Sequence, residues 1–320
     1  MTHGGPDALG AALHDFSTNA NACGPCRDAL SAVEVADPRR YPDPLYTALR
    51  ERLADFHRVD ARRIVIASSA SEFIARITAA VARRGGRRIR LPPHCYGDYL
   101  RAAGAWGFER VDHGADLVWC CDPSSPLGQP QEALDPLIHG LRAEAVCVID
   151  LAYEPLRLEG ALGLGREPLN ATWQLWTPNK ALGLTGVRAA YAIAPLDRED
   201  WVAQLAALAP SWPIGAHGVA LLESWTRSTT QRWLDESRAT LRLWKAAQRA
   251  MCESLGWQCL PSVVNYFCAN PDVPYSAERS AALRAQGIKL RDAASFGLPG
   301  HVRLGVLPPA SQEALRQAWR

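Results

Sequence analysis

Residues 176–188 read WTPNKALGLTGVR, so that Lys180 follows Thr177 by three positions and precedes Arg188 by eight. An apolar, strand-like run ends shortly before this stretch, at Asp150. Surface lysines and strands that end in aspartate are each common, so no member of the set is informative alone. Their order and spacing together are rare by chance, and they predict an enzyme site around Lys180.

These side chains meet the separate demands of one cofactor, pyridoxal phosphate. The amine of Lys180, when neutral, can form a Schiff base with the cofactor's aldehyde. The carboxylate of Asp150 would keep the ring nitrogen protonated, so that the ring accepts electrons released at a substrate's α carbon. Thr177 and Arg188 would hold the phosphate, because the planar fork of arginine matches two phosphate oxygens. Tyr153, three residues beyond Asp150, could reach the ring hydroxyl with its phenol.

Strand-like and helix-like segments alternate up to about residue 195, which predicts an α/β fold. Strands are expected at residues 64–66, 88–91, 117–121, 145–149, 172–176 and 188–193, and helices at residues 44–59 and 73–81. In open sheets of this kind, ligands bind at the carboxyl ends of the strands. Lys180 and its companions all follow a strand or begin a helix, so we expect them to gather in one crevice.

Two further segments end at the same expected crevice. Small residues fill positions 67–71, where a helix N-terminus can attract a phosphate. Tyr96 follows the expected strand at 88–91, and we interpret it as a lid stacked on the cofactor ring, with a boundary aromatic of the core as the alternative.

The remaining sequence predicts a smaller α+β domain. Helices are expected at residues 197–208, 214–225, 232–251 and 310–319, and strands at 263–268 and 302–306. Arg291 and Arg303 each stand beside an apolar, strand-like run. A buried arginine is costly unless it meets an anion, so both are candidates for binding a substrate carboxylate or phosphate. A structural salt bridge is the alternative for each.

The composition excludes several classes of function. The 320 residues carry 35 basic and 33 acidic side chains, a net charge of +2, and no basic run interleaved with aromatics predicts a nucleic-acid surface. No apolar run is long enough to cross a membrane, and the N-terminus lacks the features of a signal peptide, which predicts a cytoplasmic protein. Nine scattered cysteines predict reduced thiols. Cys23 and Cys26 form a Cys-x-x-Cys in a loop-like context that does not favour redox chemistry, and no metal site is predicted.

Further motifs resemble a known family. They are HGG at residues 3–5, DFSTNAN at 15–21, RYPDP at 40–44, WPI at 212–214, RD at 291–292, SFGLPG at 295–300 and VR at 302–303. With them the chain resembles, over nearly its whole length, the fold-type I pyridoxal phosphate enzymes, in the branch of histidinol-phosphate aminotransferase and the threonine-phosphate decarboxylase of cobalamin biosynthesis. The opening and closing blocks are more similar to the decarboxylases.

The resemblance implies the architecture of aspartate aminotransferase, in which helices sandwich a mostly parallel sheet in three layers and a smaller α+β domain follows. Residues 1–40 would pack with the small domain, residues 41–200 would form the large cofactor-binding domain, and residues 201–320 the small one. A homodimer is implied as well, with Tyr41 reaching the phosphate in the other subunit.

The resemblance also implies a role for each site residue. Lys180 would be the Schiff-base lysine, with Asp150 at the ring nitrogen and Tyr153 at the ring hydroxyl. Further cofactor contacts would come from Ala70, Ser71, Tyr96, Ser125, Thr177 and Arg188. The substrate would meet Asn19 and Arg303, the latter at its carboxylate, and its phosphate would meet His3 and Arg291.

Four positions depart from the family's pattern. Residues 122–126 read DPSSP, so Ser125 stands where the family's asparagine contacts the ring hydroxyl. Ser69 replaces a glycine of the phosphate loop, Asn179 replaces a serine or glycine, and Gly215 replaces an asparagine. These changes leave the cofactor prediction intact and bear mainly on the substrate.

Three functions therefore stay open. The favoured one is decarboxylation of L-threonine O-3-phosphate to (R)-1-amino-2-propanol O-2-phosphate, in cobalamin biosynthesis. The second is transamination of a phosphorylated amino compound such as histidinol phosphate with 2-oxoglutarate, and the third is a divergent cofactor-binding protein. The choice between the first two depends on which α-carbon bond of the substrate stands perpendicular to the cofactor ring.

Overall fold

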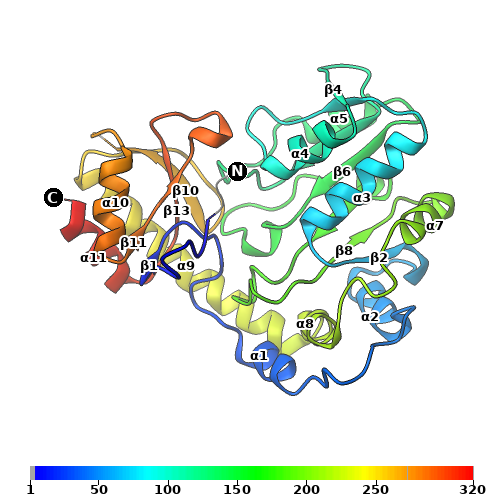
Figure 1. The fold of residues 1–320 in the computed structure, drawn as a ribbon, viewed down its shortest axis with the longest axis horizontal. Coiled ribbons are helices and arrows are strands. Elements are labelled where there is room, and N and C mark those ends of the chain that lie inside the picture. The colour runs from blue at the N-terminus through cyan, green and yellow to red at the C-terminus, as the bar shows by residue number, and fades with distance from the viewer. Residues whose placement is uncertain (1–3, 272, 320) are drawn as a thin grey trace.

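The computed structural model describes residues 4–271 and 273–319 and arranges them around two main β-sheets, with the long helix α9 (Ser228–Ser254) running from one toward the other (Figure 1). The large sheet consists, in spatial order, of β2 (Ile64–Ala67), β8 (Ala190–Ile193), β7 (Trp173–Trp176), β6 (Val146–Asp150), β5 (Leu117–Cys121), β3 (Arg88–Arg90) and β4 (Glu109–Arg110). Strand β8 is antiparallel to both of its neighbours, and the other neighbouring pairs are parallel. The prediction of a mostly parallel sheet is confirmed.

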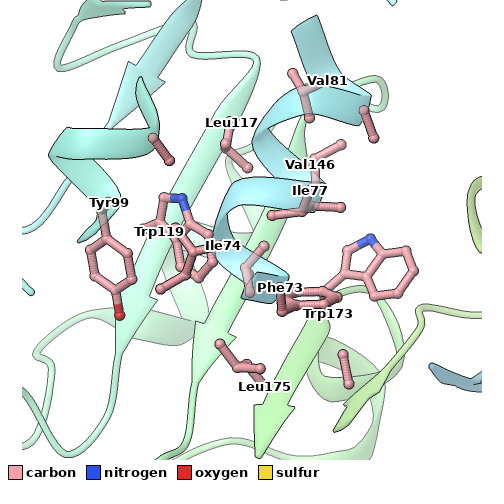
Figure 2. Close-up of a cluster of buried hydrophobic side chains, with 14 of the residues drawn as sticks. Phe73, Ile74, Ile77, Val81, Tyr99, Leu117, Trp119, Val146, Trp173 and Leu175 are labelled. Carbon is pink, nitrogen blue, oxygen red and sulfur yellow. The ribbon is translucent and has the colours of Figure 1, made fainter. Parts of the chain in front are cut away.

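Helices cover both faces of the large sheet. On one face, α3 (Ala70–Arg83), α4 (Gly97–Ala105) and α7 (Glu199–Ala207) bury the apolar cluster drawn in Figure 2. The other face carries α1 (Arg27–Glu34), α2 (Thr47–His57), α5 (Leu134–His139), α6 (Arg166–Asn170), α8 (Ala216–Trp225) and part of α9. The expected three-layer α/β architecture is therefore confirmed.

Strand β5 illustrates how the sequence produces these layers. All five of its residues are buried. Leu117 and Trp119 belong to the cluster under α3, whereas Val118 and Cys120 belong to the cluster under α5. Side chains alternate along a strand, so a strand covered on both faces needs a continuous apolar run. The LVWCC run meets this need.

The second sheet is antiparallel and forms the smaller domain. Its order is β12 (Arg291–Asp292), β13 (Val302–Gly305), β10 (Tyr266–Asn270) and β9 (Gln258–Cys259). The helices α10 (Ala277–Ala285) and α11 (Pro309–Trp319) share a buried cluster with this sheet and with the end of α9. Three short 3-10 helices, η1 (Ala61–Arg63), η2 (Glu154–Leu156) and η3 (Ala294–Phe296), complete the elements of the two domains.

The N-terminal segment contacts both parts of the molecule. Strand β1 (His14–Asp15) pairs in parallel with β11 (Ile288–Lys289) of the small domain, and the amide of Gly305 donates to the carbonyl of Phe16 at 2.7 Å. Helix α1 then packs in the core of the large domain, as does α8. The domain boundaries at residues 40 and 200 stay a prediction.

The strand expected at residues 263–268 begins three residues later, at Tyr266. The backbone before it bonds to the large domain instead of to a neighbouring strand. The amide of Val263 donates to the carbonyl of Gly128 at 2.7 Å, and the carbonyl of Val263 accepts from the amide of Leu158 at 2.6 Å. An apolar run alone does not distinguish these two uses of the backbone.

Two glycines let the N-terminal segment cross closely over the loop that carries Lys180. A Cβ atom on Gly24 would lie 3.1 Å from the Cα of Gly183, and one on Gly183 would lie 3.0 Å from the Cα of Gly24. The close approach allows the amide of Asn21 to donate to the carbonyl of Lys180 at 2.9 Å. The Cys-x-x-Cys around Gly24 therefore lies in a packing contact, with both thiols free.

A partly buried histidine under the large sheet predicts a loss of stability in acid. The Nε2 atom of His57 lies 2.7 Å from the hydroxyl of Tyr191, which also accepts a bond from Trp225, and burial lowers the pKa of His57 from 6.5 to about 4. Because the unfolded chain binds this proton more readily, the stabilisation is present above about pH 6.5 and is lost as the pH falls toward 4. We expect urea unfolding to show up to about 2 kcal/mol less stability at pH 5 than at pH 7.5 from this group. His57→Gln should remove that part of the loss, and parallel pH profiles for the two proteins would contradict the assignment.

Candidate active site

Most of the site residues predicted from the sequence meet at the carboxyl ends of the large sheet's strands, in two adjoining pockets that share Tyr96, Ser125, Tyr153 and Lys180. The inner pocket lies against the large domain, and nine of the predicted cofactor residues line it: Ala70, Ser71, Tyr96, Ser125, Asp150, Tyr153, Thr177, Lys180 and Arg188. The outer pocket opens toward the small domain, and its walls include Asn19, Arg291 and Arg303.

Asp150 lies at one end of the inner pocket, at the last position of β6, and is 5% exposed. One carboxylate oxygen accepts a hydrogen bond from the hydroxyl of Tyr99 at 2.6 Å, and the other accepts from the amide of Ala152 at 3.0 Å. Burial raises the pKa of Asp150 above its ordinary value, and these two donors and the charge of Lys180 offset part of that rise. The donors therefore favour the ionised form that a protonated ring nitrogen would require.

Lys180 reaches the space that the two pockets share. Its Nζ atom lies 3.3 Å from the hydroxyl oxygen of Thr177 and 5.3 Å from the ring centre of Tyr153. The sequence contains two other lysines, and both are engaged elsewhere: Lys245 with Glu159 and Lys289 with Asp7. Among the lysines of the chain, Lys180 alone lines either pocket.

The opposite end of the inner pocket is suited to a phosphate. It contains the N-terminus of α3, whose first amides have no acceptor within the helix. The hydroxyl of Ser71 lies 3.2 Å from that of Tyr96, and Thr177 is buried beside them in the pocket wall. Arg188 makes no ion pair or side-chain hydrogen bond with any residue in the described part of the chain, which leaves its guanidinium available to an anion.

Two of the departures from the family's pattern have a structural explanation at this end. The hydroxyl of Ser69 caps α3 by accepting from the amide of Glu72 at 3.1 Å. The side-chain amide of Asn179 donates to the carbonyls of Thr185 and Val187 at 3.4 Å each. Asn179 thus fixes the loop that leads to Arg188. Gly215 is the N-cap of α8, and nothing in the structure explains why asparagine is absent there.

Asn19 connects the N-terminal segment to the reactive side of the pockets. Its side-chain nitrogen donates to the hydroxyl of Tyr153 at 3.2 Å, while its side-chain oxygen is buried without a partner in the described structure. Asn265 holds this segment in place by donating to the carbonyls of Asn19 and Ala20 at 3.1 Å each. Ser125 is 6% exposed and lines both pockets.

Two buried arginines form the small-domain wall of the outer pocket. Arg291 of β12 and Arg303 of β13 are cross-strand partners, 5% and 7% exposed. Arg291 donates to the hydroxyl of Ser295 at 2.8 Å, and Arg303 donates to the carbonyl of Ser17 at 3.0 Å. The Nε atom of Arg303 is buried without a partner in the described structure. Burial and the nearby charge of Arg303 both lower the pKa of Arg291.

One predicted site residue, Tyr41, does not line either pocket, and the position of another, His3, is not described. Tyr41 is 77% exposed and stacks on Trp212 with ring centres 4.3 Å apart, away from both pockets. His3 lies outside the described residues, although Gly4, the next residue in the chain, lines the outer pocket. Across residues 4–271 and 273–319, no cluster of three or more His, Cys, Asp and Glu side chains could hold a metal ion, and no helix is long and apolar enough to cross a membrane.

Sequence reasoning missed Tyr99 and Cys121, which surround Asp150. Cys121 lines the inner pocket and is the β5 partner of Asp150. Tyr99 is fully buried and stands three residues after Tyr96 at the start of α4. This spacing places two side chains on the same face of a helix, and it is the signal that could have identified Tyr99.

The donors around the inner pocket fit pyridoxal phosphate. A buried carboxylate stands at one end, an amine and a phenol in the middle, and a helix N-terminus with an arginine at the other. A bound cofactor would also supply a partner near the buried side-chain oxygen of Asn179, which has none in the described structure. The fold and these residues are those of a fold-type I pyridoxal phosphate enzyme.

Comparison with known proteins identifies the family. The model of the family "Aminotransferase class I and II" matches residues 109–320. The chain therefore belongs to the aminotransferase class I and II family, whose cofactor is pyridoxal phosphate.

The similar proteins include examples of both activities in the predicted branch, together with other aminotransferases. A histidinol-phosphate aminotransferase of Rhodospirillum rubrum is 29% identical over 331 aligned residues, covering 95% of this chain and 88% of its own. A histidinol-phosphate aminotransferase structure from Sinorhizobium meliloti, in complex with pyridoxal-5'-phosphate, has a TM-score of 0.82 at 19% identity and covers 100% of this chain and 94% of its own. An L-threonine-O-3-phosphate decarboxylase structure from Porphyromonas gingivalis has a TM-score of 0.79 at 21% identity, with coverages of 95% and 97%. At these identities the structural matches establish the fold alone.

Proposed function

We propose that the protein decarboxylates L-threonine O-3-phosphate to (R)-1-amino-2-propanol O-2-phosphate, as a step of cobalamin biosynthesis. The observation that carries this proposal is the pairing of Arg291 and Arg303 beside the pocket that contains Lys180. Two buried guanidinium groups in adjacent register repel each other, and anions between them relieve the repulsion. A phosphorylated amino acid supplies a carboxylate and a phosphate at once, whereas histidinol phosphate supplies only the phosphate.

Each group around the pocket has a role in this reaction. Bound pyridoxal phosphate would supply a ring that accepts the electron pair of a broken α-carbon bond. Asp150 would hold the proton of the ring nitrogen, and the phosphate would lie at the N-terminus of α3 beside Thr177 and Arg188. Arg303 would hold the substrate's carboxylate and Arg291 its phosphate, and together they would select the bond that breaks.

The chemistry balances without an oxidant or a second substrate. The bond between the α carbon and the carboxylate breaks, carbon dioxide leaves, and the α carbon gains one proton. The Nζ atom of Lys180 is the group in the shared part of the pockets that can deliver this proton. Tyr153 and Asn19, joined by a hydrogen bond of 3.2 Å, would hold the ring hydroxyl of the cofactor.

Transamination is the second candidate, because the names of the similar curated proteins favour it. Lys180 would then remove the α hydrogen of a phosphorylated amino compound, and 2-oxoglutarate would accept the amino group. A divergent cofactor-binding protein with another activity is the third. The inner pocket would hold the cofactor in all three candidate functions. They differ in the substrate that binds and in which of its bonds breaks.

We further propose a homodimer in which Tyr41 of one subunit reaches the phosphate site of the other. Tyr41 and Trp212 form an exposed stacked pair, 77% and 39% exposed, and exposed aromatic pairs are typical of protein interfaces. Sedimentation equilibrium is expected to give a dimer, and Tyr41→Phe is expected to weaken cofactor binding.

The decarboxylation is tested by incubating the purified holoenzyme with L-threonine O-3-phosphate in the absence of any oxo acid. We expect one carbon dioxide for each 1-amino-2-propanol O-2-phosphate formed. Unphosphorylated threonine should react with a kcat/KM lower by at least about 100-fold, because it lacks the phosphate that Arg291 would hold. Activity only with histidinol phosphate and 2-oxoglutarate would establish transamination instead, and activity with neither substrate would favour the third candidate.

A further inference from the structure

Tyr99 is the one side chain that donates a hydrogen bond to the carboxylate of Asp150 in the described structure. The hydroxyl-to-carboxylate distance is 2.6 Å, which is typical of a strong bond between a hydroxyl and a charged acceptor. Burial and the neighbouring Asp150 raise the pKa of Tyr99 well above its ordinary value, so the phenol keeps its proton and remains the donor.

The position of Tyr99 is fixed by packing and not by the pocket. Its ring stacks on Trp119 of β5 (Figure 2), with centres 4.4 Å apart and planes inclined by 14°. The rings of Tyr99 and Tyr96 form a T-shaped pair. Tyr99 is fully buried and does not line either pocket. Its hydroxyl therefore acts on a ligand only through Asp150, which does line the inner pocket.

Burial alone would favour a neutral Asp150, because removing a carboxylate from water disfavours its charged form. A neutral carboxyl group would be a poor partner for a protonated ring nitrogen. The bonds from Tyr99 and from the amide of Ala152 oppose this effect and orient the carboxylate. Cys121 of β5 and Lys180 are the other titratable groups beside Asp150, and burial raises the pKa of the Cys121 thiol, which stays uncharged.

We propose that Tyr99 is a positioning residue for the cofactor's ring nitrogen, which acts by holding Asp150 ionised and correctly oriented. Tyr99 can act in this way only where the ring nitrogen meets Asp150, so its role rests on the proposed function. It does not depend on whether decarboxylation or transamination follows.

The test compares the binding of two cofactors to the apoprotein, measured by absorbance or tryptophan fluorescence. One is pyridoxal phosphate, and the other is its 1-deaza analogue, in which a C–H group replaces the ring nitrogen. Tyr99→Phe keeps the ring stacked on Trp119 and removes only the donor. We expect Tyr99→Phe to reduce the affinity for pyridoxal phosphate by about tenfold and the affinity for the deaza analogue by less than about twofold.

Two further variants complete the test. In an Asp150→Asn background, Tyr99→Phe should change the affinity for neither cofactor, because the carboxylate through which Tyr99 acts is gone. Tyr46→Phe is the matched control, since it removes another buried tyrosine hydroxyl, bonded to the carbonyl of Ile214 at 2.7 Å and remote from both pockets. It should leave both affinities unchanged.

The outcomes separate the role of Tyr99 from the placement of the cofactor. If Tyr99→Phe reduced the affinity for both cofactors equally, the hydroxyl would only support the fold, and the role proposed for Tyr99 would be overturned. An unchanged affinity for pyridoxal phosphate would overturn it as well. If Asp150→Asn also left pyridoxal phosphate binding intact, Asp150 would not meet the ring nitrogen, and that part of the proposed function would fail together with the role of Tyr99.

Discussion

Lys180→Ala is expected to abolish the covalent attachment of pyridoxal phosphate and to reduce turnover by at least about 1,000-fold. The loss is large because one amine has two functions, anchoring the cofactor and transferring the proton at the α carbon. Lys180 lies 3.3 Å from Thr177 in the wall shared by both pockets, and no other lysine of the chain lines either one. The visible absorbance of the bound cofactor and the rate of product formation measure the two functions separately.

Lys180→Arg is the matched control, because it retains the positive charge and removes the nucleophilic amine. It should be as inactive as the alanine variant. Borohydride reduction of the wild-type holoenzyme should place the cofactor on the peptide that contains Lys180 and on neither of those that contain Lys245 and Lys289. A visible cofactor band that survives in Lys180→Ala, or a label on another lysine, would refute the assignment.

The inner pocket was predictable from the sequence because its residues occupy the ends of strands. Asp150 closes β6 and Thr177 follows β7, and parallel strands bring their carboxyl ends to one edge of a sheet. Burial on both faces gave strand β5 a continuous apolar run that marks its bounds without reference to any neighbour. Features such as these can be predicted from a single stretch of sequence.

Contacts between distant segments left no such pattern. The bond between Tyr99 and Asp150 joins residues 51 positions apart, and Tyr99 reads from the sequence as an ordinary core aromatic. Val263 and Val264 resembled part of a strand, but the backbone of Val263 bonds to Gly128 and Leu158 of the large domain. Hydrogen-bond partners of this kind depend on how the two domains meet, which the periodicity of a single segment does not encode.

The pair formed by Arg291 and Arg303 was predictable from the sequence only in part. The sequence marked Arg291 and Arg303 as candidates because each stands among apolar residues, but it offered a structural salt bridge as the alternative. The antiparallel register of β12 and β13 makes them direct partners. No salt bridge to an acidic residue in the described structure involves Arg303, and its Nε atom is buried without a partner. The salt-bridge alternative is therefore not what the structure shows for Arg303.

Arg303→Ala is expected to reduce kcat/KM for L-threonine O-3-phosphate by about 100- to 1,000-fold while the cofactor stays bound. Removing one partner of a buried, hydrogen-bonded charge pair typically costs about 2–5 kcal/mol, and tenfold in affinity corresponds to about 1.4 kcal/mol. The cofactor should be unaffected because Arg303 lines only the outer pocket. Initial rates over a range of substrate concentrations measure the first effect, and the visible absorbance of the cofactor measures the second.

Two arginine variants sharpen this test. Arg303→Lys keeps the charge but not the planar fork, so it should recover part of the activity and remain well below the wild type. Arg279→Ala is the control, since Arg279 belongs to the same domain but lies over the ring of Trp319, outside both pockets. Loss of the cofactor from Arg303→Ala would show that this arginine belongs to the cofactor site. An unchanged kcat/KM would show that Arg303 does not bind the substrate's carboxylate. In either case the selection of the breaking bond would have to be assigned to other residues of the outer pocket.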